Sequence, residues 1–195
     1  MTKGRLEAFS DAVIAIILTI MVLELKVPHN PNWDALRPLF PVLLSYVLSF
    51  VYLGIYWNNH HHLFQAVKHV RGGVLWANLH LLFWLSLVPF VSGWMGENHF
   101  DKAPTALYGV VLLGAAISYT IMVQVLIRSH GPESALAKAI GRDAKGWISL
   151  LCYVSAIPLA FVMPVLSGLI YVAVAIIWLV PDRRIERVID HKDSA

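Results

Sequence analysis

Long apolar runs, broken by short polar segments, make up most of this chain. Between Asp11 and Glu24 only Thr19 is polar. A helix needs about 20 mostly apolar residues to cross the roughly 30 Å hydrocarbon core of a bilayer. On that measure the pattern predicts six membrane-spanning helices, at residues 6–25, 38–62, 74–94, 104–128, 147–163 and 169–180. The predicted fold is therefore an all-α, six-transmembrane-helix integral membrane protein.

Breaks in this pattern predict the connections between the spans. Pro89 interrupts the third span, because proline cannot donate the hydrogen bond that continues a helix. The polar stretch 129–146 is expected to hold a short amphipathic helix, and Pro164 with Gly168 to form a tight turn. The sequence has no repeat of 20 to 50 residues, so residues 1–195 are expected to form a single domain.

Composition supports a membrane protein and argues against a nucleic-acid partner. Hydrophobic residues make up 58% of the chain and charged residues 14%, with a mean hydropathy of +0.66. A soluble domain does not need so much apolar sequence. No basic tract with interleaved aromatic residues suggests nucleic-acid binding. Because Glu7 and Asp11 precede the first apolar run and no small-residue cleavage site follows it, we interpret this run as a retained span and not as a signal peptide.

Lysine and arginine placement predicts the orientation. Cytoplasmic loops carry an excess of these residues. One predicted side has only Lys26, Arg37 and Lys102. The other side collects Lys3, Arg5, Lys68, Arg71, Arg128, Lys138, Arg142, Lys145, Arg183, Arg184, Arg187 and Lys192. Six spans with this asymmetry predict a multi-pass protein of the cell (inner or plasma) membrane with both termini in the cytoplasm.

The first span has an aliphatic stripe along one side. At 100° per residue, Ile16, Ile20 and Leu23 fall close together on the helix surface, in line with Phe9, and Thr19 borders them. Spacing alone favours lipid contact or ordinary packing for this stripe, because nearly every face of the helix is apolar.

Asp11 lies on nearly the opposite side of the same helix. An acid beside a membrane span can be an ion ligand, a proton relay or half of a buried ion pair. Since Arg5 is close in the sequence, a structural pair or network is the simplest interpretation.

The run His60-His61-His62 ends the second span. Successive helical residues point about 100° apart, so three adjacent imidazoles cannot converge on one metal ion. We expect His60 to face Asp11 or Arg5, with Asn78 and His80 of the third span as further members of that network. No metal site is predicted. The chain also lacks a nucleophile elbow, an HExxH motif and a glycine-rich phosphate loop, so an enzyme is not predicted.

Several of these positions resemble one family. The pattern Arg5-x-x-x-Phe9-Ser10-Asp11, at the start of the first of six spans, resembles the signature of the transmembrane protein 175 family of potassium channels. Two further stretches are similar to that family: Trp57-x-x-His60-x-x-Leu63-Phe64-Gln65 and Asn78-Leu79. A single six-span unit of this length resembles the prokaryotic branch of the family.

The resemblance implies a homotetramer in which four copies of the first helix line a central pore for potassium ions, with no cofactor. It implies a constriction at Ile16, with Thr19, Ile20 and Leu23 as further pore-lining residues. It also implies that a structural network braces the pore helix, with the members Arg5, Phe9, Ser10, Asp11, Trp57, His60 and Asn78.

Selection by such a pore has a plausible physical basis. A narrow ring of isoleucines offers no ligands and dewets, whereas a slightly wider ring requires an ion to shed part of its hydration shell. Potassium holds water less tightly than sodium and is therefore favoured. Thr19 hydroxyls are candidate weak ligands, and Glu24 and Asp34 are candidates for concentrating cations at the outer mouth.

Two other functions remain open from the residues. A proton- or cation-coupled membrane transporter would use a carboxylate such as Asp11 together with histidines. Transporters usually contain internal repeats and broken helices at mid-membrane, and this chain shows no repeat. A membrane scaffold or enzyme subunit that transports nothing is the third possibility.

Overall fold

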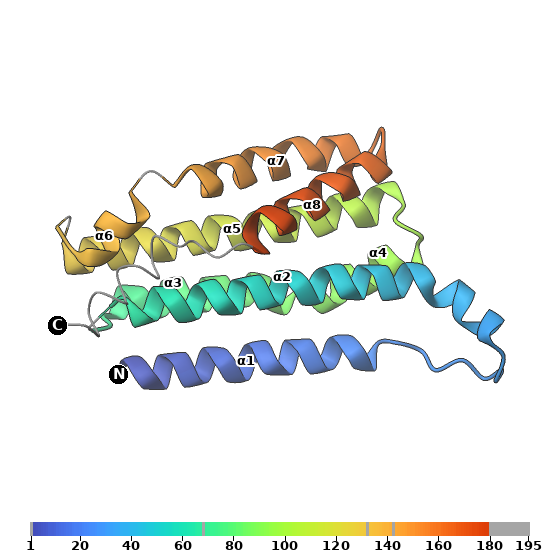
Figure 1. The fold of residues 1–195 in the computed structure, drawn as a ribbon, viewed down its shortest axis with the longest axis horizontal. Helices are drawn as coiled ribbons and strands as arrows, with labels where there is room; N and C mark the ends of the chain where they lie inside the picture. Colours follow the sequence, from blue (N-terminus) through green and yellow to red (C-terminus); the bar gives the residue numbers. More distant parts are fainter. Residues whose placement is uncertain (1, 68, 132, 142, 180–195) are drawn as a thin grey trace.

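The computed structural model describes residues 2–67, 69–131, 133–141 and 143–179. This part of the chain is helical, and its long helices run side by side along one axis (Figure 1). The elements are α1 (Lys3–Leu23), η1 (Trp33–Leu39), α2 (Phe40–Gln65), α3 (Gly72–Ser86), α4 (Val88–Glu97), α5 (Lys102–His130), α6 (Ala135–Ile140), α7 (Ala144–Ala160) and α8 (Pro164–Leu179).

Four stretches of the described residues are long and apolar enough to cross a membrane: α1, η1 with α2, α3 with α4, and α5. Helices α7 and α8 are also apolar but shorter, with 17 and 16 residues. At 1.5 Å per residue they reach about 25 Å, a little less than a typical hydrocarbon core. The chain therefore has the architecture of a multi-pass membrane protein.

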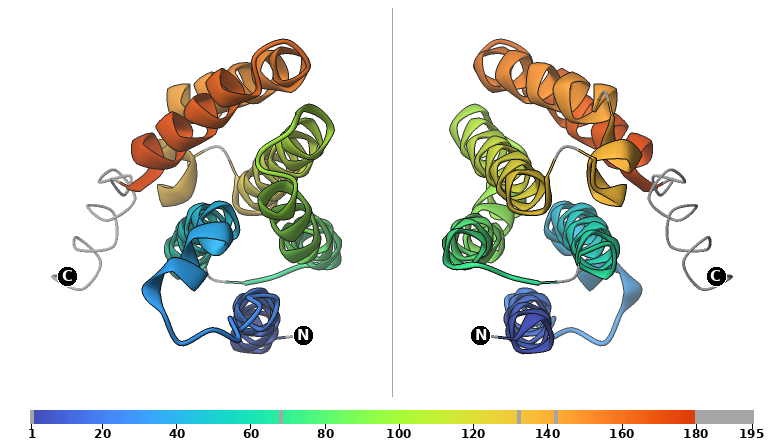
Figure 2. Two further views of the ribbon diagram at one scale, coloured as in Figure 1. Left: turned by 90° about the vertical axis from the view of Figure 1, so that its right-hand side faces the viewer. Right: turned by 90° about the vertical axis from the view of Figure 1, so that its left-hand side faces the viewer.

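Helix α1 lies at one edge of the bundle, and the α7–α8 pair lies at the opposite edge (Figure 2). Helix α1 packs on α2, α3 and α4, whereas α7 packs on α5 and α8. As a result, one long side of α1 has no cover from the part of its own chain that the structure describes.

Local chemistry sets several helix ends. Pro89 is the second residue of α4, and the helical run of α3 stops at Ser86 just before it. Asp101 caps α5 by accepting a hydrogen bond from the Lys102 amide, and Gly131 ends α5 with a positive φ of 89°. The predicted break at Pro89 is therefore present.

Two sequence predictions about the later elements differ in outcome. The short helix expected within residues 129–146 is α6, which Ser134 caps through the Ala137 amide. The tight turn expected at Pro164 and Gly168 is wrong. Pro164 is the first residue of α8 and Gly168 lies inside that helix, because proline fits the first helical turn, where its missing amide donor costs nothing.

Candidate functional site

Helix α1 has a narrow buried face. Its buried residues follow one another at intervals of three or four, which places them on one side of the helix: Leu6, Ser10, Ile14, Ile17 and Met21. This face packs against α2, α3 and α4. Only Ser10 among the five is polar, and it is fully buried.

The predicted pore stripe lies next to this buried face and is uncovered. Ile16 is 57% exposed, Ile20 42% and Leu23 81%. Thr19 and Phe9 are exposed as well. The Thr19 hydroxyl donates to the Ile16 carbonyl oxygen at 2.8 Å, so its proton is committed and its lone pairs face outward. The stripe can therefore present aliphatic groups and hydroxyl acceptors, but few donors, to whatever covers it.

A groove of about 630 Å³ runs beside the stripe, between α1 and α4. Ile16 and Ile20 line one wall, and Phe90 and Trp94 line the other. The rings of Phe90 and Trp94 are nearly parallel, with centroids 6.5 Å apart. Glu24 and Glu97 also border the groove. The groove is mainly apolar, with carboxylates where α1 and α4 end.

The buried polar group of α1 joins a hydrogen-bonded chain across three helices. Asn78 of α3 donates from Nδ2 to the Ser10 hydroxyl at 2.9 Å, and Ser10 donates to the Leu6 carbonyl oxygen. Because the Ser10 proton is used, Asn78 must present its amide nitrogen to Ser10 and its oxygen to His60. His60 Nε2 lies 2.8 Å from that oxygen and therefore carries the proton.

Asp11 is not part of this hydrogen-bonded network and has its own partner on α2. The Trp57 indole nitrogen of α2 donates to Asp11 Oδ1 at 3.0 Å. Arg5 is exposed, and the ion pairs among the described residues do not involve it. His60 was expected to face Asp11 or Arg5. It lies within electrostatic reach of Asp11, but its hydrogen bond goes to Asn78 and not to the carboxylate.

Two further histidines, His61 and His80, do not join this hydrogen-bonded network. His61 is exposed and contacts Gln65 at 2.8 Å. His80 was expected in the network, but it accepts from the Trp84 indole at 3.1 Å and faces the Ser118 hydroxyl of α5. Residues 78 and 80 are two apart and point to nearly opposite sides of α3. No cluster of three metal-ligating side chains occurs among the residues that the structure describes.

One polar contact was not found from the sequence. Lys26, beyond the end of α1, forms an ion pair with Glu97 at the end of α4, with the nitrogen and oxygen 2.6 Å apart. Asp34, which the sequence suggests as a charge at the outer mouth, pairs with Arg37 at 3.1 Å. The two residues of the first pair are 71 positions apart, so only the packing of α1 on α4 brings them together.

Known proteins resemble this chain over most of its length. The family model described as the endosomal/lysosomal potassium channel TMEM175 matches residues 5–89. A potassium channel from Chryseobacterium sp. (strain P1-3) is 56% identical over 187 residues, which cover 96% of this chain and 97% of that protein. A potassium channel from Streptomyces collinus is 33% identical over 135 residues, covering 65% of this chain and 66% of the relative.

A solved structure agrees with these relatives. The crystal structure of a lysosomal potassium-selective channel TMEM175 homolog from Chamaesiphon minutus superposes with a TM-score of 0.80 at 27% identity. The match covers 92% of this chain and 97% of that one. All of these relatives are named as ion channels, and none as an enzyme. The chain belongs to the TMEM175 family, as its Arg5-x-x-x-Phe9-Ser10-Asp11 motif predicts.

Proposed function

We propose that this protein is a potassium-selective cation channel that conducts passively through the centre of a homotetramer. The observation that carries the proposal is the uncovered aliphatic stripe of α1, in a chain whose bacterial relatives are named potassium channels. A membrane helix at the edge of its own bundle needs lipid or another chain against its open side.

The two flanks of the stripe suit a ring of copies. On one flank lies the groove between α1 and α4. On the other flank, opposite the buried face of α1, lie exposed small residues at helical spacing: Ala8, Ala12, Ala15 and Thr19. Small residues allow membrane helices to approach closely. If the small-residue face of one copy enters the groove of the next, the contact is head-to-tail and can close into a ring.

In such a ring Ile16, Ile20 and Leu23 point toward the axis. Four isoleucine side chains at one level form a constriction without ligands, which excludes water when narrow. At a slightly larger radius a cation passes after losing part of its hydration shell, which favours potassium over sodium. Thr19 offers hydroxyl lone pairs next to this level, because its proton is given to the Ile16 carbonyl oxygen.

The polar residues of the motif act as a brace. Ser10, His60 and Asn78 are buried and bond to one another, so they fix the depth and rotation of α1 against α2 and α3. The contact from Trp57 to Asp11 adds a second tie to α2. Phe9 and Arg5 are exposed in the single chain and have the position to contact a neighbouring copy or lipid headgroups.

The proposed topology has six spans in one domain of residues 1–195, with both termini in the cytoplasm. Helices α7 and α8 supply the fifth and sixth spans despite their length. The described basic residues at the end of the bundle where α1 begins are Lys3, Arg5, Arg71, Arg128, Lys138 and Lys145. Lys68, Arg142 and the basic residues after residue 179 lie outside the described residues. This excess supports a cytoplasmic location for that end, in the cell membrane.

Reversal potentials test the proposal. Purified protein is reconstituted into planar bilayers with potassium on one side and sodium on the other. A potassium-selective channel gives a current that reverses near the potassium equilibrium potential and follows only the electrochemical gradient. Flux that depends on a proton or sodium gradient would indicate the coupled transporter, and no flux in proteoliposomes would indicate a scaffold.

A further inference from the structure

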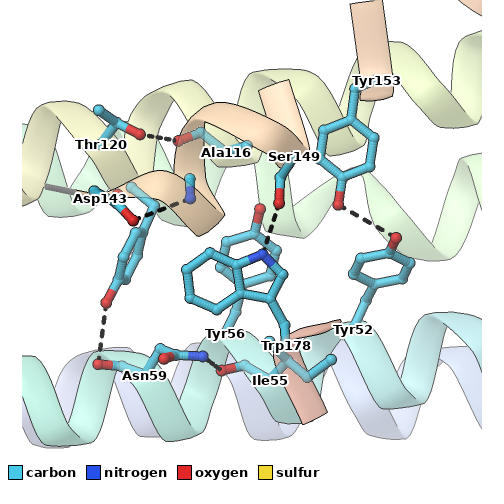
Figure 3. A pocket seen from close by; sticks show the side chains of 12 residues that line it. Tyr52, Ile55, Tyr56, Asn59, Ala116, Thr120, Asp143, Ser149, Tyr153 and Trp178 are labelled. Atoms are coloured by element: carbon cyan, nitrogen blue, oxygen red, sulfur yellow. Dashed lines mark hydrogen bonds between the residues drawn. The ribbon is translucent and has the colours of Figure 1, made fainter. Parts of the chain in front are cut away.

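A second site lies inside the subunit, away from α1. A cavity of about 40 Å³ is enclosed by α2, α5, α7 and α8 (Figure 3). One water needs about 10–15 Å³ of such space, so the cavity has room for about three or four waters. Five of its twelve lining residues are aromatic: Tyr52, Tyr56, Tyr119, Tyr153 and Trp178.

The donors of these walls are already in use. Thr120 donates to the Ala116 carbonyl oxygen at 2.9 Å, and the Asn59 amide donates to the Ile55 carbonyl oxygen at 2.8 Å. Figure 3 shows both bonds running along the walls and not into the cavity.

The same holds for the remaining aromatic groups. Tyr153 donates to the Tyr52 hydroxyl, and Tyr52 donates to the Tyr171 carbonyl oxygen. The Trp178 indole donates to the Ser149 hydroxyl at 2.8 Å. Among the hydroxyl, amide and indole donors on the lining residues that the structure describes, the Tyr56 hydroxyl and one of the two N–H groups of the Asn59 amide are those without a protein acceptor.

The groups that remain available to a ligand in the cavity are therefore mainly hydrogen-bond acceptors and the faces of aromatic rings. The side-chain oxygen of Asn59, the second carboxylate oxygen of Asp143 and the hydroxyl lone pairs of Thr120 are acceptors. The faces of the tyrosine and indole rings carry the negative side of the ring quadrupole. A cavity whose walls offer ring faces and more acceptors than free donors suits a cation better than an anion.

We propose that this cavity binds one monovalent cation of the size of potassium, K⁺ or ammonium, in each subunit. Oxygen acceptors coordinate either ion, and both retain favourable contacts with aromatic faces. The cavity has too little space for a larger organic cation. Its acceptors include no cluster of three histidine, cysteine, aspartate or glutamate side chains among the described residues, which disfavours a transition metal.

A fixed charge nearby limits the ion to a single charge. The Lys145 ammonium lies over the Trp178 ring, 6.0 Å from its centroid, and contacts the Ile177 carbonyl oxygen. The Asp143 carboxylate caps α7 through the Gly146 amide. Repulsion by the Lys145 charge is twice as large for a divalent ion as for a monovalent one, which favours a single charge on the bound ion.

Thallous ion, which imitates potassium and scatters anomalously, locates the site directly. Crystals of the full-length tetramer grown in a thallous salt should show one anomalous peak per subunit between Asn59, Tyr56 and Asp143. Peaks on the central axis serve as an internal control for ion entry. Peaks on the axis without a peak in the cavity would overturn the proposal and leave the cavity to water. The proposal does not depend on conduction, because the site lies within one subunit.

Thermal unfolding provides a matched second test. At about ten times Kd, potassium or ammonium should raise the unfolding midpoint by about 4 °C over sodium at equal ionic strength. The variant Asn59→Leu should lose this difference, because it removes an acceptor from the cavity wall. The variant Asn58→Leu, one residue away and outside the lining, should retain it. An unchanged potassium effect in Asn59→Leu would place the responsible cation elsewhere and reject the site.

Discussion

His60 of α2 and Asn78 of α3 are joined by a buried hydrogen bond of 2.8 Å, with the proton on His60 Nε2. The direction of this bond follows from Ser10, whose own proton is given to Leu6 and which can therefore only accept from Asn78. The Asn78 side chain thus forms hydrogen bonds to two other helices at once. Its replacement removes an acceptor and a donor together.

The variant Asn78→Leu should destabilise the protein by about 2 kcal/mol, because His60 and Ser10 both lose a buried partner. Chemical denaturation of the protein in detergent, followed by tryptophan fluorescence, measures this loss. Asn98→Leu is the matched control. Asn98 is exposed and contacts only its own helix at the Trp94 carbonyl oxygen, so its loss should change stability by less than about 0.5 kcal/mol. Equal losses of stability in the two variants would contradict the proposal that Asn78 braces α1 against α2 and α3.

Asp11 should matter for assembly and not for selection. We expect Asp11→Ala to reduce the fraction of tetramer, because the contact from Trp57 that orients α1 is lost. The reversal potential of the tetramer that remains should stay within error of wild type. Size-exclusion chromatography with light scattering measures the first quantity and bilayer recording the second. A stable Asp11→Ala tetramer with lost selectivity would instead make Asp11 an ion ligand in the pore.

Gly96 allows α4 to approach α2 closely. A Cβ atom at Gly96 would lie 2.7 Å from the Val42 Cα atom, which belongs to the backbone and cannot rotate away, and it would overlap the Ser45 hydroxyl. Gly96→Ala should therefore cost about 2–3 kcal/mol of stability. Gly168→Ala in α8 is the control, since nothing lies within 4 Å of its added Cβ atom and it lies away from the groove. It should be neutral or stabilising by up to about 1 kcal/mol through helix propensity. Destabilisation by Gly168→Ala of the same size would refute the close approach at Gly96.

The ion pair between Lys26 and Glu97 predicts a pH dependence. The hydrogen bond to Glu97, and then its charge, raise the pKa of Lys26 above the ordinary value of 10.5. Stability from this pair is complete below about pH 10.5 and is lost as the pH rises through the raised pKa of the folded state. Competitive acetylation with mass spectrometry reports the pKa of each lysine. Glu97→Gln should lower the pKa of Lys26. An unchanged pKa of Lys26 in this variant would contradict the ion pair.

Local pattern was enough to predict much of the fold. Apolar runs and prolines predict the long helices to within a few residues, as with α1 at Lys3–Leu23 against 6–25. The start of α8 was misplaced because Pro164 was interpreted as a turn former, although proline equally begins helices. Charge near a span end is also a weak guide. It does not identify the partner of Lys26, which is Glu97 on a helix far away in the sequence.

The candidate site, like the fold, could be predicted from the sequence only in part. The motif identifies Ser10, His60 and Asn78 as a set, but spacing does not say which of them touch. His60 was paired with Asp11 by charge, and the structure pairs it with an amide, because a buried imidazole needs a hydrogen-bond partner more than a neighbouring charge. The cavity behind α2 gives no signal in the sequence, since its tyrosines come from three separate helices.

Ile16 is the residue on which the proposed selection depends. Its side chain is 57% exposed in the single chain, on the side of α1 that faces the axis of the proposed ring. Ile16→Asn places four amides at the constriction, so water and hydrated ions should pass more easily. We expect a higher single-channel conductance and a potassium-over-sodium permeability ratio that falls at least severalfold in bilayer recordings. Ile16→Val is the matched control. It keeps the ring aliphatic and should retain most of the selectivity, with at most a modest rise in conductance. Unchanged selectivity in Ile16→Asn would move the constriction to Ile20 or Leu23, and equal loss in both variants would show that ring size, and not its aliphatic character, selects the ion.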